Sequence, residues 1–466
     1  MSRNEVSPPC SEIGGHSAEP SLLGQLSSSA VTTVLDEHPL SRFQLWTILL
    51  CGIVVILDGF DTQCMGVLVP VISENLHIAP SAFGPVLAAA LFGLMIAAMA
   101  SGPIADRYGR RWVVIVSVLV FATFALLTAR AQTLRELIVL RFLTGLGLGG
   151  AMPNAVALTA EYTPKRLQPI VVGAIFVGMP AGGLIASGAA SVLVPLFGWR
   201  SVLVLGGVLP LMVAFVLIKV LPESVRFLSA TGSNPEAVSR IMRRLSPNLG
   251  HVPIAVAAPE PTRRGVPVKH LFTEGRAPGT LLLWVPFFMN LLILYFILSW
   301  LPQLLRQLHL PVIAGAQAVA AFSLGGIFGT LFQGHVMRAV GARTLLLIEF
   351  LICTALIWSL SVIASSVTPM LIITLVLGIV VQGAQAGLNA LAAGFYPTAV
   401  RATGIGWALG VGRIGSIVGP SLGGVLLSWK WTPDQIFLAG IVPAACAALA
   451  IVLSHALPPR SNAFQT

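Results

Sequence analysis

Charged residues are scarce in this sequence. Asp, Glu, Lys and Arg make up only 9% of its 466 residues, whereas 56% are hydrophobic and the mean hydropathy is +0.90. A soluble domain usually carries about 25% charged residues. The shortage argues against a soluble enzyme and indicates a chain that lies in a lipid bilayer, where each span must satisfy its own backbone hydrogen bonds.

The motifs of nucleotide hydrolysis, of hydrolases and of zinc sites are also missing. There is no P-loop, no G-x-S-x-G and no paired-cysteine zinc motif, and the five cysteines are scattered. The formal net charge of +10 does not gather on one helix or tail, as a nucleic-acid-binding face would require. We therefore expect no enzyme activity, no disulfide, no metal site and no nucleic-acid partner.

What the sequence does contain is a series of apolar runs, each about as long as the ~20 residues that cross a bilayer as a helix. The runs lie near residues 44–69, 82–105, 112–130, 135–157, 168–196, 201–221, 279–301, 312–334, 343–364, 369–394, 403–428 and 436–456. The sequence therefore predicts an all-α membrane protein with 12 transmembrane helices.

A polar segment separates the first six runs from the last six. We expect a six-helix half at 42–221, a cytoplasmic central loop at 222–278 and a second six-helix half at 279–457. Residues 1–41 are rich in Ser, Pro and Gly and lack the apolar region of a signal peptide, so a disordered cytoplasmic tail is predicted. Residues 458–466 are expected to form a second cytoplasmic tail.

The distribution of Lys and Arg predicts the orientation of the chain. With the N-terminus in the cytoplasm, 19 of the 27 Lys and Arg residues fall on the cytoplasmic side, 5 fall outside and 3 lie within spans. Cytoplasmic loops keep positive charge during membrane insertion. We therefore expect a multi-pass protein surrounded by the lipid bilayer, with both termini and the central loop in the cytoplasm.

The two halves repeat at an offset of 232 residues. The matching pairs are Pro70 and Pro302, Leu76 and Leu308, His77 and His309, Gly102 and Gly334, Gly109 and Gly341, and Arg111 and Arg343. Membrane transporters are often built from such internal repeats. Because the offset holds at several helix ends, two halves of common architecture are predicted.

The loop between the second and third runs reads G-P-I-A-D-R-Y-G-R-R. It resembles the signature loop of the major facilitator superfamily, which implies a fold of two six-helix halves. Glycine permits close helix approach, and a carboxylate among arginines can form a clasp that breaks as the halves move. The loop residues to which this assigns a gating role are Gly102, Asp106, Arg107, Gly109 and Arg110. The alternative is a positively charged anchor. The second copy has Arg338 at the acidic position, so a symmetric clasp is not implied.

Further segments narrow the resemblance. They are D-G-F-D at Asp58 to Asp61, R-F-L-T-G-L-G-L-G-G from Arg141, A-E-Y-T-P-K-R ending at Arg166, and Y-P-T-A-V-R-A-T-G-I-G from Tyr396. Together they resemble the aromatic acid:proton symporter family, which includes transporters of 4-hydroxybenzoate and benzoate. The resemblance implies uptake of a small aromatic carboxylic acid, such as a hydroxybenzoate, with a proton as the coupling ion and no other cofactor. We expect a monomer.

Asp58 and Asp61 are the candidate proton-coupling residues. They lie three positions apart, so they share one face of a helix well inside a span. Burial and mutual repulsion favour the protonated form of such carboxyls, as a coupling site requires. The alternative is a structural pair that bonds to neighbouring helices. At the repeat offset Asp58 corresponds to Asn290, so the acid is confined to the first half.

Arg141 and Arg413 are the candidate residues for the substrate carboxylate. Both lie well inside predicted spans, where a cation needs an anion or a wet cavity. A guanidinium binds a carboxylate through two parallel hydrogen bonds. The alternative for Arg141 is a permanent ion pair with Asp58 or Asp61.

Two further residues are predicted to gate transport. Glu161 and Arg401 lie where the fourth and tenth spans reach the cytoplasm, at equivalent ends of the halves, with a purely topological role as the alternative. Weaker site candidates are the polar residues Glu349, Gln382 and Asn389, each of which can instead form a hydrogen bond between helices.

Two other functions compete with uptake. Proton-coupled efflux of drugs or metabolites is suggested by G-M-P-A-G-G at Gly178 and G-P-S-L-G-G at Gly419, which resemble the glycine-proline pattern of antiporters. The third hypothesis is a transporter-like sensor that does not transport. The predicted central loop contains no obvious signalling domain, which argues against this hypothesis.

Overall fold

The computed structural model describes residues 40–225, 227–228, 241, 268–273, 275–363, 366–397 and 400–455. Within these residues the regular structure is helical, and 12 segments are long and apolar enough to cross a membrane. The prediction of an all-α protein with 12 membrane-spanning helices is confirmed. The predicted tails and most of the predicted central loop lie outside the described residues.

Each half contributes six spans. In the first half they are α2 (Arg42–Leu76), α3 (Phe83–Tyr108), α4 (Arg110–Thr128), α5 (Leu134–Tyr162), α6 (Gln168–Phe176) together with α7 (Gly178–Phe197), and α8 (Trp199–Val220). In the second half they are α11 (Ala277–Gln307), α12 (Val312–Val340), α13 (Ala342–Ile363), α14 (Val367–Phe395), α15 (Arg401–Ser428), and α16 (Pro433–Ala439) together with α17 (Ile441–His455).

Several helices extend beyond the apolar runs that predicted them. α2 continues to Leu76 although its run ends near residue 69, and α5 continues to Tyr162 although its run ends near residue 157. The extra turns contain polar residues, which lower the local hydropathy and therefore mark the predicted end of the span. A helix can continue there because its ends reach water at the membrane surface.

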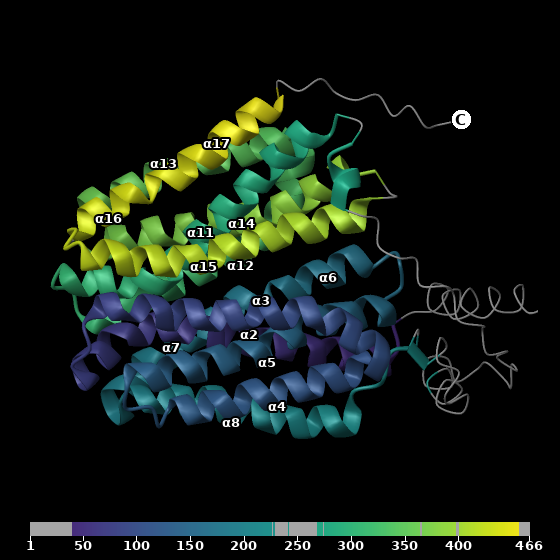
Figure 1. Cartoon of the computed structure of the whole chain (residues 1–466), viewed down its shortest axis with the longest axis horizontal. Helices are drawn as coiled ribbons and strands as arrows, with labels where there is room; N and C mark the ends of the chain where they lie inside the picture. Colours follow the sequence, from purple (N-terminus) through teal and green to yellow (C-terminus); the bar gives the residue numbers. More distant parts are fainter. Residues whose placement is uncertain are drawn as a thin grey trace, which may run out of the picture.

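Figure 1 shows the helices as two bundles that pack lengthwise against each other. The helices α2 to α8, purple to teal, form one bundle, and α11 to α17, green to yellow, form the other. The bundles meet chiefly through α2 with α11, α3 with α15, and α7 with α12. The predicted division into two six-helix halves is confirmed.

The backbone repeats at the predicted offset. His77 and His309 both take left-handed conformations at the ends of their helices, with φ of 54° and 63°. Gly109 and Gly341 both connect two consecutive helices with φ of 90° and 87°. A positive φ is uncommon for a residue other than glycine, so its recurrence at equivalent histidines shows that the same turn is built twice.

The pseudo-symmetry axis passes between α2 and α11. Gly66 packs so closely on α11 that an added Cβ would collide with the carbonyl of Leu298, its repeat equivalent. Two turns further along, Glu74 pairs with Arg306 at 2.9 Å, and these residues are again repeat equivalents. We call the end of the molecule that holds this ion pair the far end, and the end where α3 meets α4 at Gly109 the loop end.

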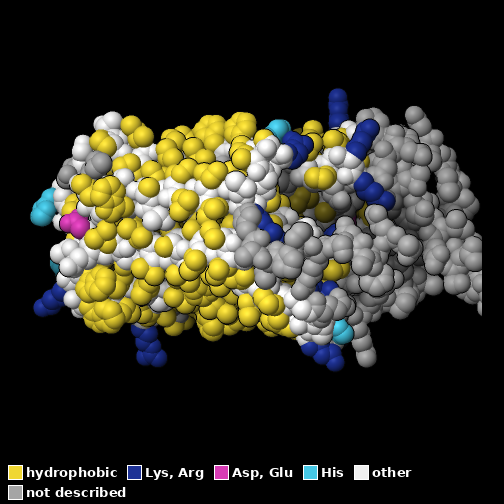
Figure 2. All heavy atoms as spheres, turned by 90° about the horizontal axis from the view of Figure 1, so that it is seen from above, with side chains coloured by type: hydrophobic (Ala, Val, Ile, Leu, Met, Phe, Trp, Pro, Cys, Tyr) yellow, Lys and Arg dark blue, Asp and Glu magenta, His cyan; other side chains and the backbone are white. Residues whose placement is uncertain are grey.

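The outer surface is apolar over the middle of the helices. Figure 2 shows hydrophobic side chains across the centre of one face, with most Lys and Arg side chains toward its two ends. On the second half of the molecule, Trp358 of α13 and Val442 of α17 are among the large exposed hydrophobic residues. Such a belt suits lipid and not water. The chain is a multi-pass membrane protein.

Candidate functional site

The two acidic residues of α2 lie buried in the middle of the helix. Asp58 and Asp61 are each only 1% exposed. The hydroxyl of Thr62 donates a hydrogen bond to Oδ1 of Asp58 at 3.2 Å. Because Asp58, Asp61 and Thr62 are spaced at i, i+3 and i+4, their side chains lie on one side of α2.

Arg141 of α5 forms an ion pair with Asp61. Nη2 of the arginine donates to Oδ2 of the aspartate, and both side chains are 1% exposed. Oδ1 of Asp61 and both Nε and Nη1 of Arg141 have no hydrogen-bond partner among the described residues. A buried guanidinium that uses one of its three nitrogens retains the capacity to bind a second carboxylate.

Arg413 approaches the same region from the other half. Its side chain is partly buried on α15, and its positive charge acts on the carboxyl of Asp58 and the hydroxyl of Tyr295. Asp58 therefore has its charged neighbour across the boundary between the halves, whereas Asp61 has its ion-pair partner within its own half. Relative movement of the halves would change the first interaction more than the second.

The glycines around Arg413 divide between two roles. Added Cβ atoms at Gly412 and Gly415 would press on α11, at Phe287 and Phe288, so these glycines let α15 pack against that helix. Gly410 faces open space, with nothing within 4 Å of an added Cβ.

A pocket brings α2, α3, α5 and α11 together at this point. Its polar lining consists of Asp61, Thr62, Arg141, Tyr295 and Ser299. Its apolar lining consists of Met65, Val86, Leu87, Ala90, Leu91, Leu94, Leu148 and Leu298. A charged group and several hydroxyls surrounded by aliphatic side chains suit a small ligand with a carboxylate and an apolar body.

The pocket lies beside the crossing of α2 and α11. Leu298 both lines the pocket and packs on Gly66, and the Glu74–Arg306 ion pair closes the same two helices further toward the far end. Gln63 of α2 adds another link between the halves, because its Oε1 accepts a hydrogen bond from Ser323 of α12 at 3.0 Å. Its Nε2 donates to the carbonyl of Met179, which belongs to α7 of the same half. The Glu74–Arg306 pair therefore joins the halves on the far side of the pocket, and Gln63 joins them at the level of the pocket.

The loop between α3 and α4, for which a gating role is predicted, makes its ion pair within the first half. Arg110 pairs with Glu161 at 2.6 Å, and Ser224 donates to the same carboxylate at 2.5 Å. Gly102, Asp106 and Arg107 are exposed. Asp106 takes part in none of the ion pairs found in the described part of the chain.

Glu223 is a loop-end residue that the sequence reasoning missed. Its carboxylate accepts hydrogen bonds from the backbone N–H of Arg111 at 3.0 Å and of Ser224 at 2.8 Å. It lies against Gly109, where an added Cβ would meet a carboxylate carbon 2.7 Å away. The glycine is therefore required both by its φ of 90° and by this carboxylate.

Asp58, Arg413 and the remaining candidates are not among the residues that line the pocket. Arg401 is exposed and donates to the carbonyl of Tyr396 at 3.2 Å, and it is not paired with Glu161 in the structure. Buried Glu349 accepts from Gln333 at 3.2 Å, which is a bond between α13 and α12. The other two candidates lie on α14, where Gln382 packs on Gly326 of α12 and Asn389 has a buried, unpartnered Oδ1.

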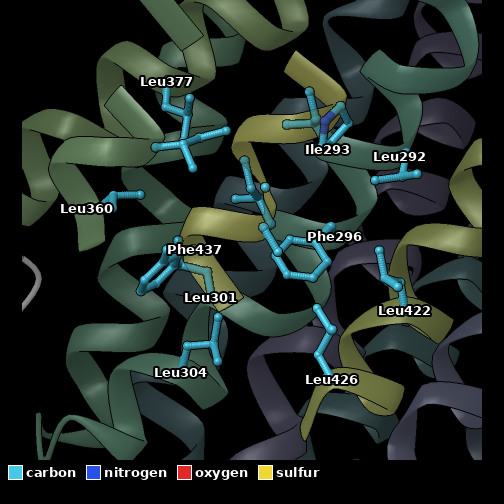
Figure 3. A pocket seen from close by; sticks show the side chains of 15 residues that line it. Leu292, Ile293, Phe296, Leu301, Leu304, Leu360, Leu377, Leu422, Leu426 and Phe437 are labelled. Carbon is cyan, nitrogen blue, oxygen red and sulfur yellow. The ribbon is translucent and has the colours of Figure 1, made fainter. Parts of the chain in front are cut away.

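A second cavity lies within the other half and is almost entirely apolar. Figure 3 shows its lining, to which α11, α13, α14, α15 and α16 contribute leucine, isoleucine and phenylalanine side chains. No charged or hydroxyl side chain lines it. It therefore offers no partner to a carboxylate, and the pocket at Asp61 and Arg141 is the candidate transport site.

Comparisons with known proteins agree with this architecture. The model of the Major Facilitator Superfamily matches residues 51–377. A 4-hydroxybenzoate transporter of Pseudomonas aeruginosa is 38% identical over 434 residues, which cover 91% of this chain and 96% of that protein. A gallate transporter of Pseudomonas putida is 36% identical, with coverage of 90% and 93%. A benzoate transport protein of Acinetobacter baylyi is 33% identical, with coverage of 91% and 92%.

Among solved structures, the chain is similar to a bacterial homologue of the human lysosomal transporter Spinster in an inward-facing, unoccupied conformation. The TM-score is 0.62 over 89% of this chain and 96% of that one, at 16% sequence identity, which shows a common fold. The chain is thus a membrane transporter and not an enzyme, and it belongs to the major facilitator superfamily, in the group that contains the 4-hydroxybenzoate, gallate and benzoate transporters.

Proposed function

We propose that this transporter takes up a small aromatic carboxylic acid, such as a hydroxybenzoate, together with a proton. The observation that carries the proposal is the buried pair of Asp61 and Arg141, which lines a largely apolar pocket and leaves two guanidinium nitrogens unpartnered. The relatives that share about a third of its residues are transporters of 4-hydroxybenzoate, gallate and benzoate.

Coupling follows from the charge balance at Asp61 and Arg141. In the empty site the carboxylate of Asp61 compensates the guanidinium of Arg141. A substrate carboxylate would place a second anion against the same cation, and an uncompensated charge in such a buried position costs several kcal/mol. If Asp61 takes up a proton, the substrate anion replaces it as the partner of Arg141. Proton and substrate therefore bind favourably together, and each raises the affinity for the other.

Asp58 and Arg413 extend this scheme across the two halves. Their electrostatic interaction acts between α2 and α15, which belong to different halves, so it depends on how closely the halves approach each other. Arg413 is the less buried of the two site arginines, and we propose that it supplies a second cation for the substrate carboxylate. Protonation of Asp58 would free Arg413 from its acidic neighbour in the same way that protonation of Asp61 frees Arg141.

The orientation of the chain in the membrane is proposed from its distribution of charge. The loop end carries Arg107, Arg110, Arg111 and Arg401, and an excess of such residues favours the cytoplasm. We therefore place the chain in a bacterial inner membrane with the loop end and both termini in the cytoplasm, as a monomer. In this orientation the Glu74–Arg306 pair would close the molecule toward the outside.

Transport by purified protein in proteoliposomes tests the proposal. With labelled hydroxybenzoate outside and an imposed pH gradient, acid outside, the account predicts accumulation above the equilibrium level. Collapse of the gradient with a protonophore should abolish accumulation while leaving counterflow exchange. Uptake driven by the opposite gradient would indicate a proton-coupled antiporter, and the absence of both counterflow and binding would favour a sensor for a different ligand; either result would contradict the proposal.

A further inference from the structure

We infer that Ser299 recognises a hydroxyl group on the aromatic ring of the substrate and so determines which ring substituents are accepted. This inference rests on the proposed function and assigns a role within the same pocket. Ser299 belongs to α11, in the half opposite to the acidic residues, and is 6% exposed.

The pocket is lined by three side chains that carry a hydroxyl group, and two of these already have polar partners. Thr62 donates to Asp58, and the Tyr295 hydroxyl has the cationic side chain of Arg413 as its neighbour. Ser299 lines the pocket too, but its hydroxyl makes no hydrogen bond with any residue that the structure describes. It is therefore the hydroxyl of the pocket that remains available to a ligand.

A missing internal hydrogen bond is unusual for a serine in these helices. Ser101 donates to the carbonyl of Ala98 at 2.9 Å, and Ser416 donates to that of Arg413 at 2.6 Å, as serines in membrane helices commonly do. Ser299 could satisfy itself in the same way within α11, yet its hydroxyl is not engaged there. A polar group that lines a buried pocket without a partner costs free energy unless a ligand or water meets it.

The position of Ser299 relative to the charged group suits a ring substituent. Tyr295 and Ser299 lie one turn apart on the same face of α11, opposite Asp61 and Thr62 of α2. Arg141 supplies the cation for the carboxylate, and the leucines of α3 and α5 supply an apolar surface for the ring. What a hydroxybenzoate adds to a benzoate is one hydroxyl, and Ser299 can both donate to it and accept from it.

Equilibrium binding to the purified full-length protein tests the inference, with 4-hydroxybenzoate, 3-hydroxybenzoate and benzoate as probes. Ser299→Ala should weaken binding of one of the two hydroxybenzoates about 3- to 10-fold, the effect of one neutral hydrogen bond, and leave benzoate binding unchanged. The unchanged benzoate affinity also shows that the variant is folded.

Ser187→Ala is the matched control. Ser187 of α7 is fully buried with an unpartnered hydroxyl but does not line the pocket, so its removal should change none of the three affinities. An equal loss for all three acids in Ser299→Ala, or no loss for any, would overturn the role of Ser299 and leave the proposed function standing. If the wild-type protein bound none of the acids, the proposed function would fail, and the inference with it.

Discussion

The two halves share a backbone plan but differ in charge. Asp58 and Asp61 of α2 correspond at the repeat offset to Asn290 and Ile293 of α11. Asn290 is fully buried and donates to the carbonyl of Val381 at 3.1 Å and to Oε1 of Gln385 at 3.0 Å. In the second half an amide thus joins two helices permanently, where the first half has an acid that can gain or lose a proton.

This difference indicates a division of labour between the halves. The first half holds the buried acids and their nearest cation, Arg141. The second half supplies Tyr295, Ser299 and Arg413, which face these acids or the pocket without adding an acid of their own. The repeat accounts for the fold and its pseudo-symmetry axis, whereas the departures from the repeat provide the charged residues on which the proposed coupling of a proton to an anion depends.

The largest effect should come from breaking the ion pair of the first half. Arg141→Met leaves Asp61 buried without its cation, so we expect loss of transport and a destabilisation of about 3–5 kcal/mol. Adding Asp61→Leu removes the second charge and should restore most of the stability but none of the transport. Thermal unfolding and counterflow, measured on both variants, separate the two effects. A single variant as stable as the wild type would show that the pair is not buried as the structure has it.

Asp58→Asn makes α2 resemble α11 at the position of Asn290. The amide keeps the shape of the side chain but cannot titrate, so proton-driven accumulation should be lost while binding of the acid survives. Uptake against a concentration gradient and equilibrium binding are the two measurements. The matched control is Asn290→Gln, which alters the equivalent amide of α11 without adding or removing a titratable group. Full accumulation by Asp58→Asn would remove Asp58 from the coupling mechanism.

Arg413 tests the contribution of the second half to anion binding. Arg413→Gln should weaken binding of an aromatic acid by roughly 2 kcal/mol, about thirtyfold, because a charge partner is removed. Arg413→Lys should recover part of this loss, since an ammonium keeps the charge but not the planar pair of donors. The corresponding aromatic amide, which is neutral, should bind both variants like the wild type. Equal losses for acid and amide would mean that Arg413 supports helix packing instead.

The ion pair at the far end should give the smallest effect. Glu74 and Arg306 are 56% and 40% exposed, and such pairs contribute about 0.2–1 kcal/mol. Glu74→Gln should therefore shift the balance of conformations toward opening at the far end by at most about fivefold. Distances between spin labels at Gln132 and Gln307 would report the shift. The reversed pair, Glu74→Arg with Arg306→Glu, should restore the wild-type distribution, and failure to do so would exclude a pairwise role.

The fold could be predicted largely from the sequence because membrane spans are set by local hydropathy. The twelve runs, the division into halves and the repeat offset are all properties of short segments, and the structure has each of them. Helix ends were harder to predict from the sequence. α2 continues past its apolar run through polar residues such as Glu74, whose contacts form only in the folded chain.

The site could be predicted in part. Buried charges in a membrane span are conspicuous in a sequence, so Asp58, Asp61, Arg141 and Arg413 could be chosen as candidates from the sequence alone. The pairing of Asp61 with Arg141 depends on packing between α2 and α5. Ser299 and Gln63 carry no such signal, because uncharged polar residues in spans are common. Their contacts across the halves appear only in three dimensions.

The central claim is that an aromatic acid binds to Arg141 only as Asp61 takes up a proton. The most direct measurement is the change in pH when 4-hydroxybenzoate, added as its anion near pH 7, binds to purified protein in weak buffer. The account predicts uptake of at least about one proton for each acid bound, and a smaller uptake in Asp61→Asn. Binding of the acid by the wild-type protein with no proton uptake would contradict the claim.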